Sequence, residues 1–395
     1  MAVFILSGCY TTCSELEPPP RPAALTSQVE VEGGLLASLP DGGVLVAGCD
    51  RLWFYDQNLE LRAEAVPFPG VDACIKDLAV NEVGDVYVAG SVHTALPDDL
   101  DAFVARLTPA GEVVWARQFG SESNDEALAL DLGADGVVVG GYTNFELPGE
   151  ASHGGRDFFV ASYGSGGDLL SLKQLGTSAR DGLSDVVVLD GAIYAIGVSE
   201  GDLPGGEDVA SKERAFVARL NDGLEPVWWW SAAASGAYAE GDWGPVAAAA
   251  DGGVILTYVE DPDTSTALLE LSSDGDLAWR RRVGTGKLDR VNDLLVLPGY
   301  GVFVLGETYG AFPGYREPVC GFPIESRAEY SDAFLLRADP AGKTVAAIQF
   351  GGVERDAGIS LAAGPDRLYA AYWKSGDVFG QSPVLYLASF DLQKL

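Results

Sequence analysis

The chain has 395 residues, 47% of them hydrophobic, and carries 58 acidic against 25 basic residues, for a net charge of −33. A surface this negative repels phosphate groups, which excludes nucleic acid as a partner and an anionic lipid surface held by charge alone. Downstream of the amino end, no segment reaches the ~18 consecutive apolar residues that a membrane helix requires.

The amino end carries a short apolar run, "MAVFILSGCYTTC". The segment Leu6-Ser7-Gly8-Cys9 resembles the lipobox of bacterial lipoproteins, whose cysteine is lipidated and becomes the mature amino terminus. The run is shorter than a complete signal peptide and no positive charge precedes it, so a chance match to a loose pattern is the alternative. Residues 1–9 are interpreted as a partial lipoprotein-type signal segment, and residues 10–26 as a Pro-rich tether.

The lipobox resemblance implies a location as well as a modification. Lipid on Cys9 would anchor the protein in the bacterial cell envelope, at the outer membrane or the cell surface. We expect contact with the membrane only through this amino-terminal anchor, because the rest of the chain is strongly acidic.

After the tether, one pattern recurs along the chain. The phrase "DAFVARLTPAGEVVW" begins at Asp101, and related phrases begin at Arg51, Asp157, Arg214, Thr266, Asp332 and Pro383, which makes seven copies. Short runs rich in Val, Tyr, Phe and Trp, bounded by Gly, Asp and Pro, are typical of strands. Seven units of four strands predict an all-β protein: a single seven-bladed β-propeller of four-stranded antiparallel blades over residues 27–395.

The cysteines divide into one at the lipobox and four others. Cys13, Cys49, Cys74 and Cys320 are an even number, which is compatible with disulfides in an exported chain, and their spacing fits no metal site. Cys49 ends a strand of the first unit and Cys74 begins the second unit, so we expect them on adjacent blades. A Cys49–Cys74 disulfide is one interpretation, and two buried free thiols are the other.

Four aspartates recur at the links between successive units: Asp125, Asp181, Asp289 and Asp356. They are candidates for a ring that binds a cation such as calcium. The alternative is that each aspartate caps backbone N–H groups in its own turn. Recurrence favours the structural interpretation, because a feature found in every blade builds the blade. We expect no other metal and no organic cofactor.

Few residues offer catalytic chemistry. The chain has two histidines, His93 and His153, and no zinc-protease or nucleotide-binding motif. "GVSEG" from Gly197 matches the G-x-S-x-G nucleophile pattern but lacks the strand–turn–helix that this pattern requires. Pairs of carboxylates leave open one enzymatic alternative, a propeller hydrolase or lyase acting on polysaccharide.

The loops between the second and third strands of the units are long and unequal, whereas the other hairpin turns are short. Antiparallel order places all the long loops at one end of the propeller, which makes that end the candidate binding face. The loop at 307–331 gathers the ligand-binding candidates Tyr309, Phe312, Tyr315, Arg316, Phe322 and Tyr330. They would form an aromatic platform for sugar rings or a protein segment; the alternative is a small core that covers the loop.

The last unit stops at "FDLQKL", short of a fourth strand, while "SQVEVEGG" from Ser27 is a strand without a unit of its own. We expect residues 27–32 to supply the outer strand of the blade formed by residues 357–390. This pairing closes the ring and leaves no open seam between the first and last units.

The repeat also resembles a known family, the bacterial seven-bladed β-propeller repeat (SBBP) proteins. The matching segments are the phrase at Asp101, "GYTNFELPG" from Gly141 and "GETYGAFPG" from Gly306. The resemblance covers nearly everything after the tether, and it is weak in the first, fifth and last units. It implies the propeller fold and export more than any activity. The sequence thus predicts a non-enzymatic, exported, lipid-anchored module that binds a protein or glycan through its long loops.

Overall fold

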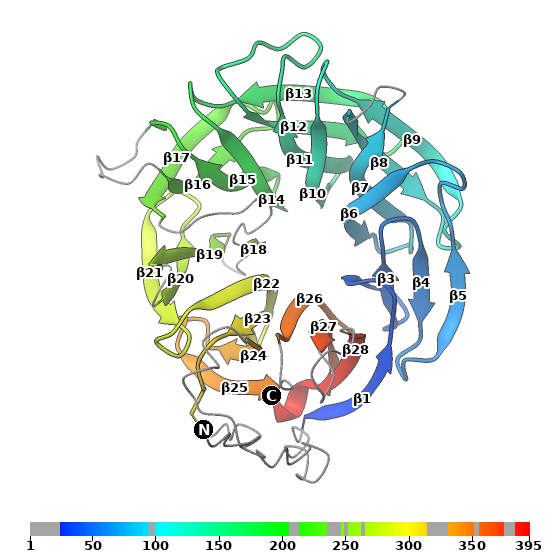
Figure 1. The fold of residues 1–395 in the computed structure, drawn as a ribbon, viewed down its shortest axis with the longest axis vertical. Helices are drawn as coiled ribbons and strands as arrows, with labels where there is room; N and C mark the ends of the chain where they lie inside the picture. Colours follow the sequence, from blue (N-terminus) through cyan, green and yellow to red (C-terminus); the bar gives the residue numbers. More distant parts are fainter. Residues whose placement is uncertain are drawn as a thin grey trace, which may run out of the picture.

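The computed structural model describes residues 24–94, 99–204, 213–234, 246–248, 252–261, 265–313, 331–350, 355–374 and 384–395. Over these ranges the chain is all-β: seven four-stranded antiparallel sheets stand around a common axis as the blades of a propeller (Figure 1). The predicted fold class is correct. In the described part of the chain, the last residues form a short 3-10 helix, Leu392–Lys394, and no helix is long and apolar enough to cross a membrane.

Strands within a blade are called a to d from the axis outward. Blade 1 holds β2 (Leu35–Ser38), β3 (Val44–Ala47), β4 (Leu52–Tyr55) and β5 (Leu61–Ala65). Blade 2 holds β6 (Ala73–Val80), β7 (Val86–His93), β8 (Leu100–Leu107) and β9 (Val113–Phe119), and blade 3 holds β10 (Asp125–Gly133), β11 (Gly136–Thr143), β12 (Asp157–Gly164) and β13 (Leu169–Leu175). Blade 4 holds β14 (Asp181–Leu189), β15 (Ala192–Ser199), β16 (Arg214–Leu220) and β17 (Pro226–Ala233).

The remaining strands complete the ring. Blade 5 holds β18 (Val246–Ala248), β19 (Val254–Asp261), β20 (Ser265–Leu271) and β21 (Leu277–Val283). Blade 6 holds β22 (Asp289–Leu297), β23 (Gly301–Thr308), β24 (Asp332–Ala338) and β25 (Thr344–Phe350). Blade 7 holds β26 (Ala357–Ala363), β27 (Arg367–Lys374), β28 (Val384–Asp391) and, as its outer strand, β1 (Leu25–Glu30).

The hydrophobic core lies between blades. Strands b are buried on both faces, as in β15 and β23, because each blade is covered by a neighbour on either side. The cluster between blades 1 and 2 joins Leu45 to Val88, and the cluster between blades 7 and 1 joins Val46 to Tyr369. No blade therefore buries its apolar residues alone, which is why the repeat must be stacked into a ring.

The turns between strands c and d share one backbone conformation, with a glycine at positive φ. Gly111, Gly167, Gly275 and Gly342 occupy this turn with φ of 82°, 83°, 88° and 74°. Positive φ is readily adopted only by glycine, which explains the recurrent "AG" or "DG" in the repeat. Leu59 and Leu224 adopt φ of 63° and 61° in the turns of blades 1 and 4 and lie buried in the core.

The amino-terminal strand closes the ring. β1 pairs antiparallel with β28, with Val29 opposite Leu387, so that the first and last strands of the chain lie side by side (Figure 1). The strand runs from Leu25 to Glu30 rather than over residues 27–32. The Tyr372 hydroxyl of blade 7 donates to Gln28 Oε1 at 3.1 Å. One blade is thus assembled from both ends of the chain.

Aspartates on the inner strands tie neighbouring blades together. Asp77 accepts hydrogen bonds from the backbone N–H groups of Leu78 at 2.8 Å and of Leu130, in blade 3, at 2.7 Å. Asp293 accepts in the same way from Leu294 at 2.7 Å and from Leu361, in blade 7, at 2.6 Å. Inner strands are sheet edges, so these carboxylates satisfy amide groups that would otherwise be buried without partners.

Candidate functional site

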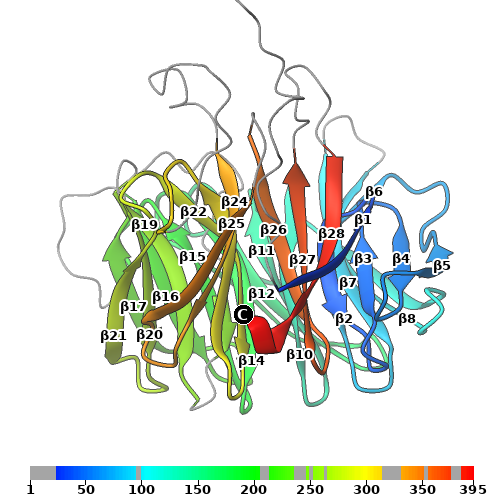
Figure 2. The same cartoon turned by 90° about the horizontal axis from the view of Figure 1, so that it is seen from below.

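The connections of the propeller differ sharply between its two ends. Seen from the side, the strands run roughly along the axis, so connections fall on two opposite faces (Figure 2). The loop-rich face carries the b–c connections, among them residues 144–156, 200–213 and 309–331, together with the links between blades. The plain face carries the short a–b and c–d turns. This is the asymmetry that the repeat predicted.

A glutamine near the end of strand d holds the loop in blade 3. The Gln174 side chain accepts from Leu147 N at 2.9 Å and donates to Phe145 O at 3.1 Å and to Asp157 Oδ2 at 2.7 Å. Gln349 makes the same three contacts in blade 6, with Phe312 N, Gly310 O and Asp332 Oδ2. The aspartate that opens the repeated phrase and this glutamine therefore form a clamp that positions each loop.

The apolar residue in each of these loops points into the core. Leu147, Leu203 and Phe312 are 1%, 8% and 6% exposed, and the Phe312 ring packs against Phe334 at 5.1 Å. Phe312 was predicted to contact ligand; it is instead a core residue, because the clamp draws the loop inward. Tyr309 is partly buried, and its N–H donates to Leu288 O. The other candidates, Tyr315, Arg316, Phe322 and Tyr330, lie outside the described residues.

Three of the four recurrent aspartates at the links cap their own turns. Asp181 accepts from the N–H and the hydroxyl of Thr177, and Asp289 accepts likewise from Thr285. Asp125 accepts from the N–H and hydroxyl of Ser121, and burial raises the pKa of Asp125 to about 6. Burial also raises the pKa of Asp181 and Asp289.

Asp356 is 1% exposed, and its N–H donates to Ser331 O at 2.7 Å. Over the described ranges, no three His, Cys, Asp or Glu side chains gather in a way that could hold a metal ion. The capping contacts of the other three aspartates account for their recurrence.

The motif "GVSEG" does not form a nucleophile. Ser199 is 0% exposed, and its hydroxyl contacts Gly201 O at 3.3 Å. The two histidines contact aspartates. The backbone N–H of His153 donates to Asp157 Oδ2, and His93 Nε2 lies 4.0 Å from Asp72 Oδ2. Ser199, His153 and His93 belong to three different blades.

One aromatic side chain breaks the symmetry of the loop-rich face. Phe145 is 57% exposed, although its backbone carbonyl accepts from Thr143 Oγ1 at 2.8 Å and from Gln174. The equivalent positions in blades 2, 4 and 6 are Thr94, Gly201 and Gly310. A Cβ atom on Gly201 would lie 2.1 Å from Thr177 Oγ1, and one on Gly310 would lie 2.0 Å from Thr285 Oγ1. Blades 4 and 6 therefore have no room for a larger residue at this position.

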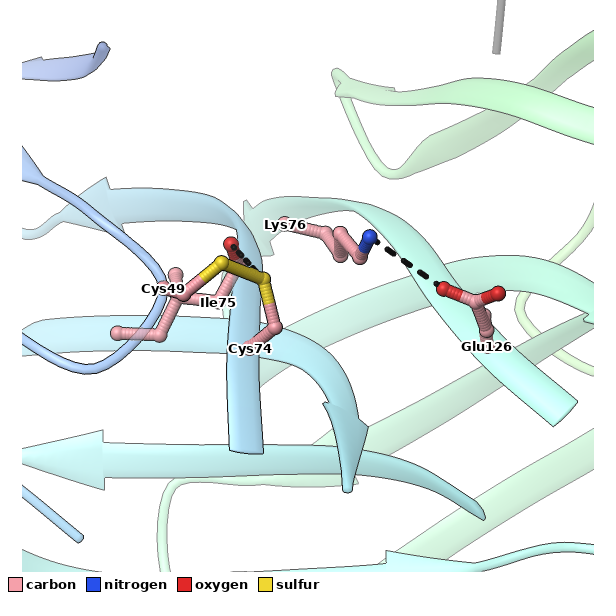
Figure 3. Close-up of a disulfide and its surroundings, with 5 residues drawn as sticks. All are labelled: Cys49, Cys74, Ile75, Lys76 and Glu126. Atoms are coloured by element: carbon pink, nitrogen blue, oxygen red, sulfur yellow. Dashed lines mark hydrogen bonds and ion pairs between the residues drawn. A yellow bond between two sulfur atoms is a disulfide. The ribbon is translucent and has the colours of Figure 1, made fainter. Parts of the chain in front are cut away.

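Polar and aromatic residues lie at the two ends of the loop that carries Phe145. The Arg156 guanidinium lies over the Tyr142 ring, 3.9 Å from its centroid, and Arg156 Nε donates to Asn144 at 3.4 Å. The Tyr142 hydroxyl donates to Glu126, which also pairs with Lys76 at 3.5 Å (Figure 3). We call these residues the Phe145 patch. Sequence reasoning missed it, although Phe145 stands out in "NFELPG" where other units have "YGAFPG" or "EGDLPG".

A disulfide lies beside this patch. Cys49, in the b–c connection of blade 1, is bonded to Cys74 on β6 of blade 2, so the bond joins adjacent blades at the loop-rich face (Figure 3). Ile75 N also donates to Cys49 O at 2.8 Å across the same interface. Of the two interpretations open from the sequence, the structure has the disulfide.

No protein-family model matches the chain. The chain is similar to the regulatory protein FlaEY of Caulobacter vibrioides, with 33% identity over 144 residues, which are 31% of this chain and 15% of FlaEY. The chain thus matches a small part of that relative's length.

Among solved structures, the chain is similar to one in a mitotic checkpoint complex, with a TM-score of 0.53 and 10% identity over 99% of this chain and 95% of the other. It is also similar to the Pan2 WD40 domain of Neurospora crassa, with a TM-score of 0.53 and 10% identity over 94% of this chain and 97% of the other. At this identity the likeness shows the fold alone. Structure and comparisons agree on one statement: the chain is a seven-bladed β-propeller.

Proposed function

We propose that the protein is a non-enzymatic binding module whose partner, a protein segment, contacts the loop-rich face at the Phe145 patch. The observation that carries this proposal is an exposed aromatic ring on a backbone held by the Gln174 clamp. An aromatic residue fixed in place loses little conformational entropy on binding, and aromatic and arginine side chains dominate the energetics of protein interfaces.

The chemistry of the patch favours a protein partner. Arg156 and Tyr142 lie together at the ends of the loop that carries Phe145, so this loop combines a cation, a phenol and an exposed apolar ring. The similarity to a regulatory protein is compatible with this role. Tyr309, Tyr315, Arg316, Phe322 and Tyr330 of the 307–331 loop are proposed to extend the contact on the same face. The function requires no cofactor.

We expect Phe145→Ala to weaken partner binding by about 30-fold, on the order of 2 kcal/mol, because the ring is an exposed anchor. Its effect on the free energy of unfolding should stay below about 0.5 kcal/mol, since the side chain contributes little to the core. Affinity is measured on a partner identified by crosslinking from envelope extract, with a glycan array run in parallel.

Two variants control this experiment. Leu170→Ala removes a side chain of similar exposure, 61%, from the outer strand of the same blade and should leave binding unchanged. Leu147→Ala removes the buried residue of the same loop and should lower stability by about 2 to 5 kcal/mol. Equal binding by wild type and Phe145→Ala would place the interface elsewhere, and saturable glycan binding lost in Phe145→Ala would replace the protein partner by a glycan.

We further propose that the protein is exported, lipid-anchored at Cys9 and related to the SBBP-type propellers. The Cys49–Cys74 disulfide supports an oxidising compartment. The clamps of Asp157 with Gln174 and Asp332 with Gln349 lie in two of the units where the SBBP resemblance is strongest.

Mature protein from the native cell envelope should begin at Cys9 and carry acyl chains, and Cys9→Ala should leave it unlipidated and released from membranes. Intact-mass spectrometry of the purified protein measures both. Recovery of unmodified residues 1–12 in the mature protein contradicts the anchor but leaves the proposed binding site untouched.

A further inference from the structure

Three blades carry an arginine at the same position of strand c. Register with strand b places Arg106 opposite Tyr87, Arg219 opposite Tyr194 and Arg337 opposite Phe303, close to the plain face. Arg106 donates to Asp85 Oδ2 at 2.6 Å and to Ser165 O at 2.9 Å. Arg337 donates to Tyr300 O at 2.7 Å. In blades 2 and 6 the guanidinium is therefore bound by the protein itself.

Arg219 has no such partner. Within the part of the chain that the structure describes, its guanidinium makes neither a hydrogen bond nor an ion pair. The Nε atoms of Arg219 and Arg106 are both buried without an acceptor, so the two arginines differ at their terminal nitrogens, which only Arg106 has paired. A guanidinium is always charged, and a half-buried one favours an anionic acceptor. Arg219 thus differs from Arg106 and Arg337, whose guanidinium groups each have an acceptor within the protein.

Arg219 lacks the acceptor that Arg106 has because the turn between strands a and b is shorter in blade 4 than in blade 2. Strands a and b of blade 2 are joined by residues 81–85, and those of blade 4 by Asp190 and Gly191, whose φ are 50° and 78°. This two-residue turn places Ala192 at the register position that Asp85 occupies in blade 2. The carboxylate that binds Arg106 is thus missing from blade 4.

The aromatic residues beside the arginine are arranged in the same way in blades 2 and 4. The Tyr194 and Trp228 ring centroids lie 6.0 Å apart, and those of Tyr87 and Trp115 lie 6.2 Å apart. Trp228 donates to Ser273 O, as Trp115 donates to Ser165 O, both at 2.9 Å. Blade 4 therefore keeps the aromatic contacts of this arrangement but lacks both the carboxylate and the arginine-to-carbonyl hydrogen bond that hold Arg106 in blade 2.

A surface pocket of about 370 Å³ lies at this point, lined among others by Asp190, Gly191, Ala192, Arg219, Asn221 and Val227. No atom lies within 4 Å of the place where a Cβ on Gly191 would stand, so the space is open. Val227, 52% exposed, adds an apolar wall. Asp190 and Asp222 also border the pocket and repel an anionic ligand, so a ligand with one negative charge is favoured over a ligand with two.

We propose that this blade-4 pocket binds a single carboxylate attached to a small apolar group, with Arg219 as its charged partner. The carboxylate takes the place that Asp85 holds in blade 2. Two sources share this chemistry, the free carboxyl terminus of a polypeptide and a small monocarboxylic acid. The site lies on the plain face and is independent of the Phe145 patch.

The test uses three probes and the full chain: N-acetyl-Gly-Gly-Val with a free carboxylate, the same peptide as its carboxamide, and isobutyrate. Dissociation constants are taken from NMR titrations of the probes. The peptide acid should bind at least about tenfold more tightly than the carboxamide, because only the acid forms charge-assisted hydrogen bonds. Tighter binding of the peptide acid than of isobutyrate identifies a chain terminus as the source, and the reverse order identifies a free acid.

Two variants locate the site. Ala192→Asp restores the internal carboxylate at a position without positive φ, and should weaken binding of the acid at least about tenfold by pairing with Arg219. Arg219→Met should have the same effect without adding a charge. Arg106→Met and Phe145→Ala are controls that should leave binding unchanged. Equal affinity for acid and carboxamide, or undiminished binding in both pocket variants, would overturn the proposal.

Discussion

Deletion of residues 1–33 should lower the melting temperature of the protein by roughly 5 to 10 °C. These residues include β1, which forms the outer strand of blade 7 by pairing with β28. Loss of the strand removes a ladder of backbone hydrogen bonds and exposes the edge of β28, at a cost on the order of 5 kcal/mol. A propeller whose first and last blades are no longer joined by one sheet should also unfold less cooperatively.

The matched control is deletion of residues 1–23, which ends before β1 and should leave the melting temperature unchanged. Differential scanning calorimetry of both truncated proteins and the full chain measures the difference. Thr26 reinforces the strand, because its hydroxyl donates to Ser389 O at 2.8 Å. If the two truncations melt at the same temperature, β1 contributes nothing to ring closure.

Stability should fall as pH rises from about 4 to 7, and Asp77 should account for a large share of the effect. Burial raises the pKa of Asp77 from 3.8 to about 7, with the amide hydrogen bonds of Leu130 and Leu78 opposing the shift. Burial likewise raises the pKa of Asp293 to about 6.

In the unfolded chain these carboxyl groups ionise near pH 4, whereas in the folded chain they keep their protons to higher pH. The folded state therefore binds more protons between these values, so raising the pH through this window destabilises it. For Asp77 the span of about three pH units corresponds to as much as about 4 kcal/mol.

Chemical denaturation at a series of pH values tests this dependence. Asp77→Asn cannot titrate, so its stability should depend less steeply on pH between 5 and 7 than that of the wild type, even though the amide retains only one acceptor atom. Repulsion among the other acidic residues changes with pH in the same way in both proteins. The difference between their stability profiles therefore isolates the contribution of Asp77. Parallel profiles would show that Asp77 stays ionised in the fold.

The candidate site could be predicted only in part from the repeated sequence. The repeated Asp, Gln and Leu or Phe positions are visible in the sequence, but their role as a clamp is not, because Asp157 and Gln174 belong to different strands that meet only in the sheet. Phe312 and Phe145 look alike as loop aromatics. Which of them is buried depends on the register of the loop above the clamp, and the buried position of Phe312 matches the small core that the sequence left open as the alternative.

By itself, the sequence determined the all-β class, the seven units, the use of both chain ends in one blade and the contrast between the two faces. These features depend on local signals: short β-rich runs, turns at positive φ and an unpaired strand at each end. Only the tertiary structure decided what neighbouring blades do to one another. The bond from Leu130 to Asp77 is such a case. The tertiary structure also decided two features within single blades, the exposure of Phe145 in blade 3 and the pocket around Arg219 in blade 4. Each depends on residues that are distant in sequence or on the length of one turn. Pairing of strands within a blade and packing of one blade against the next bring these groups together, and no periodicity along the chain encodes those contacts.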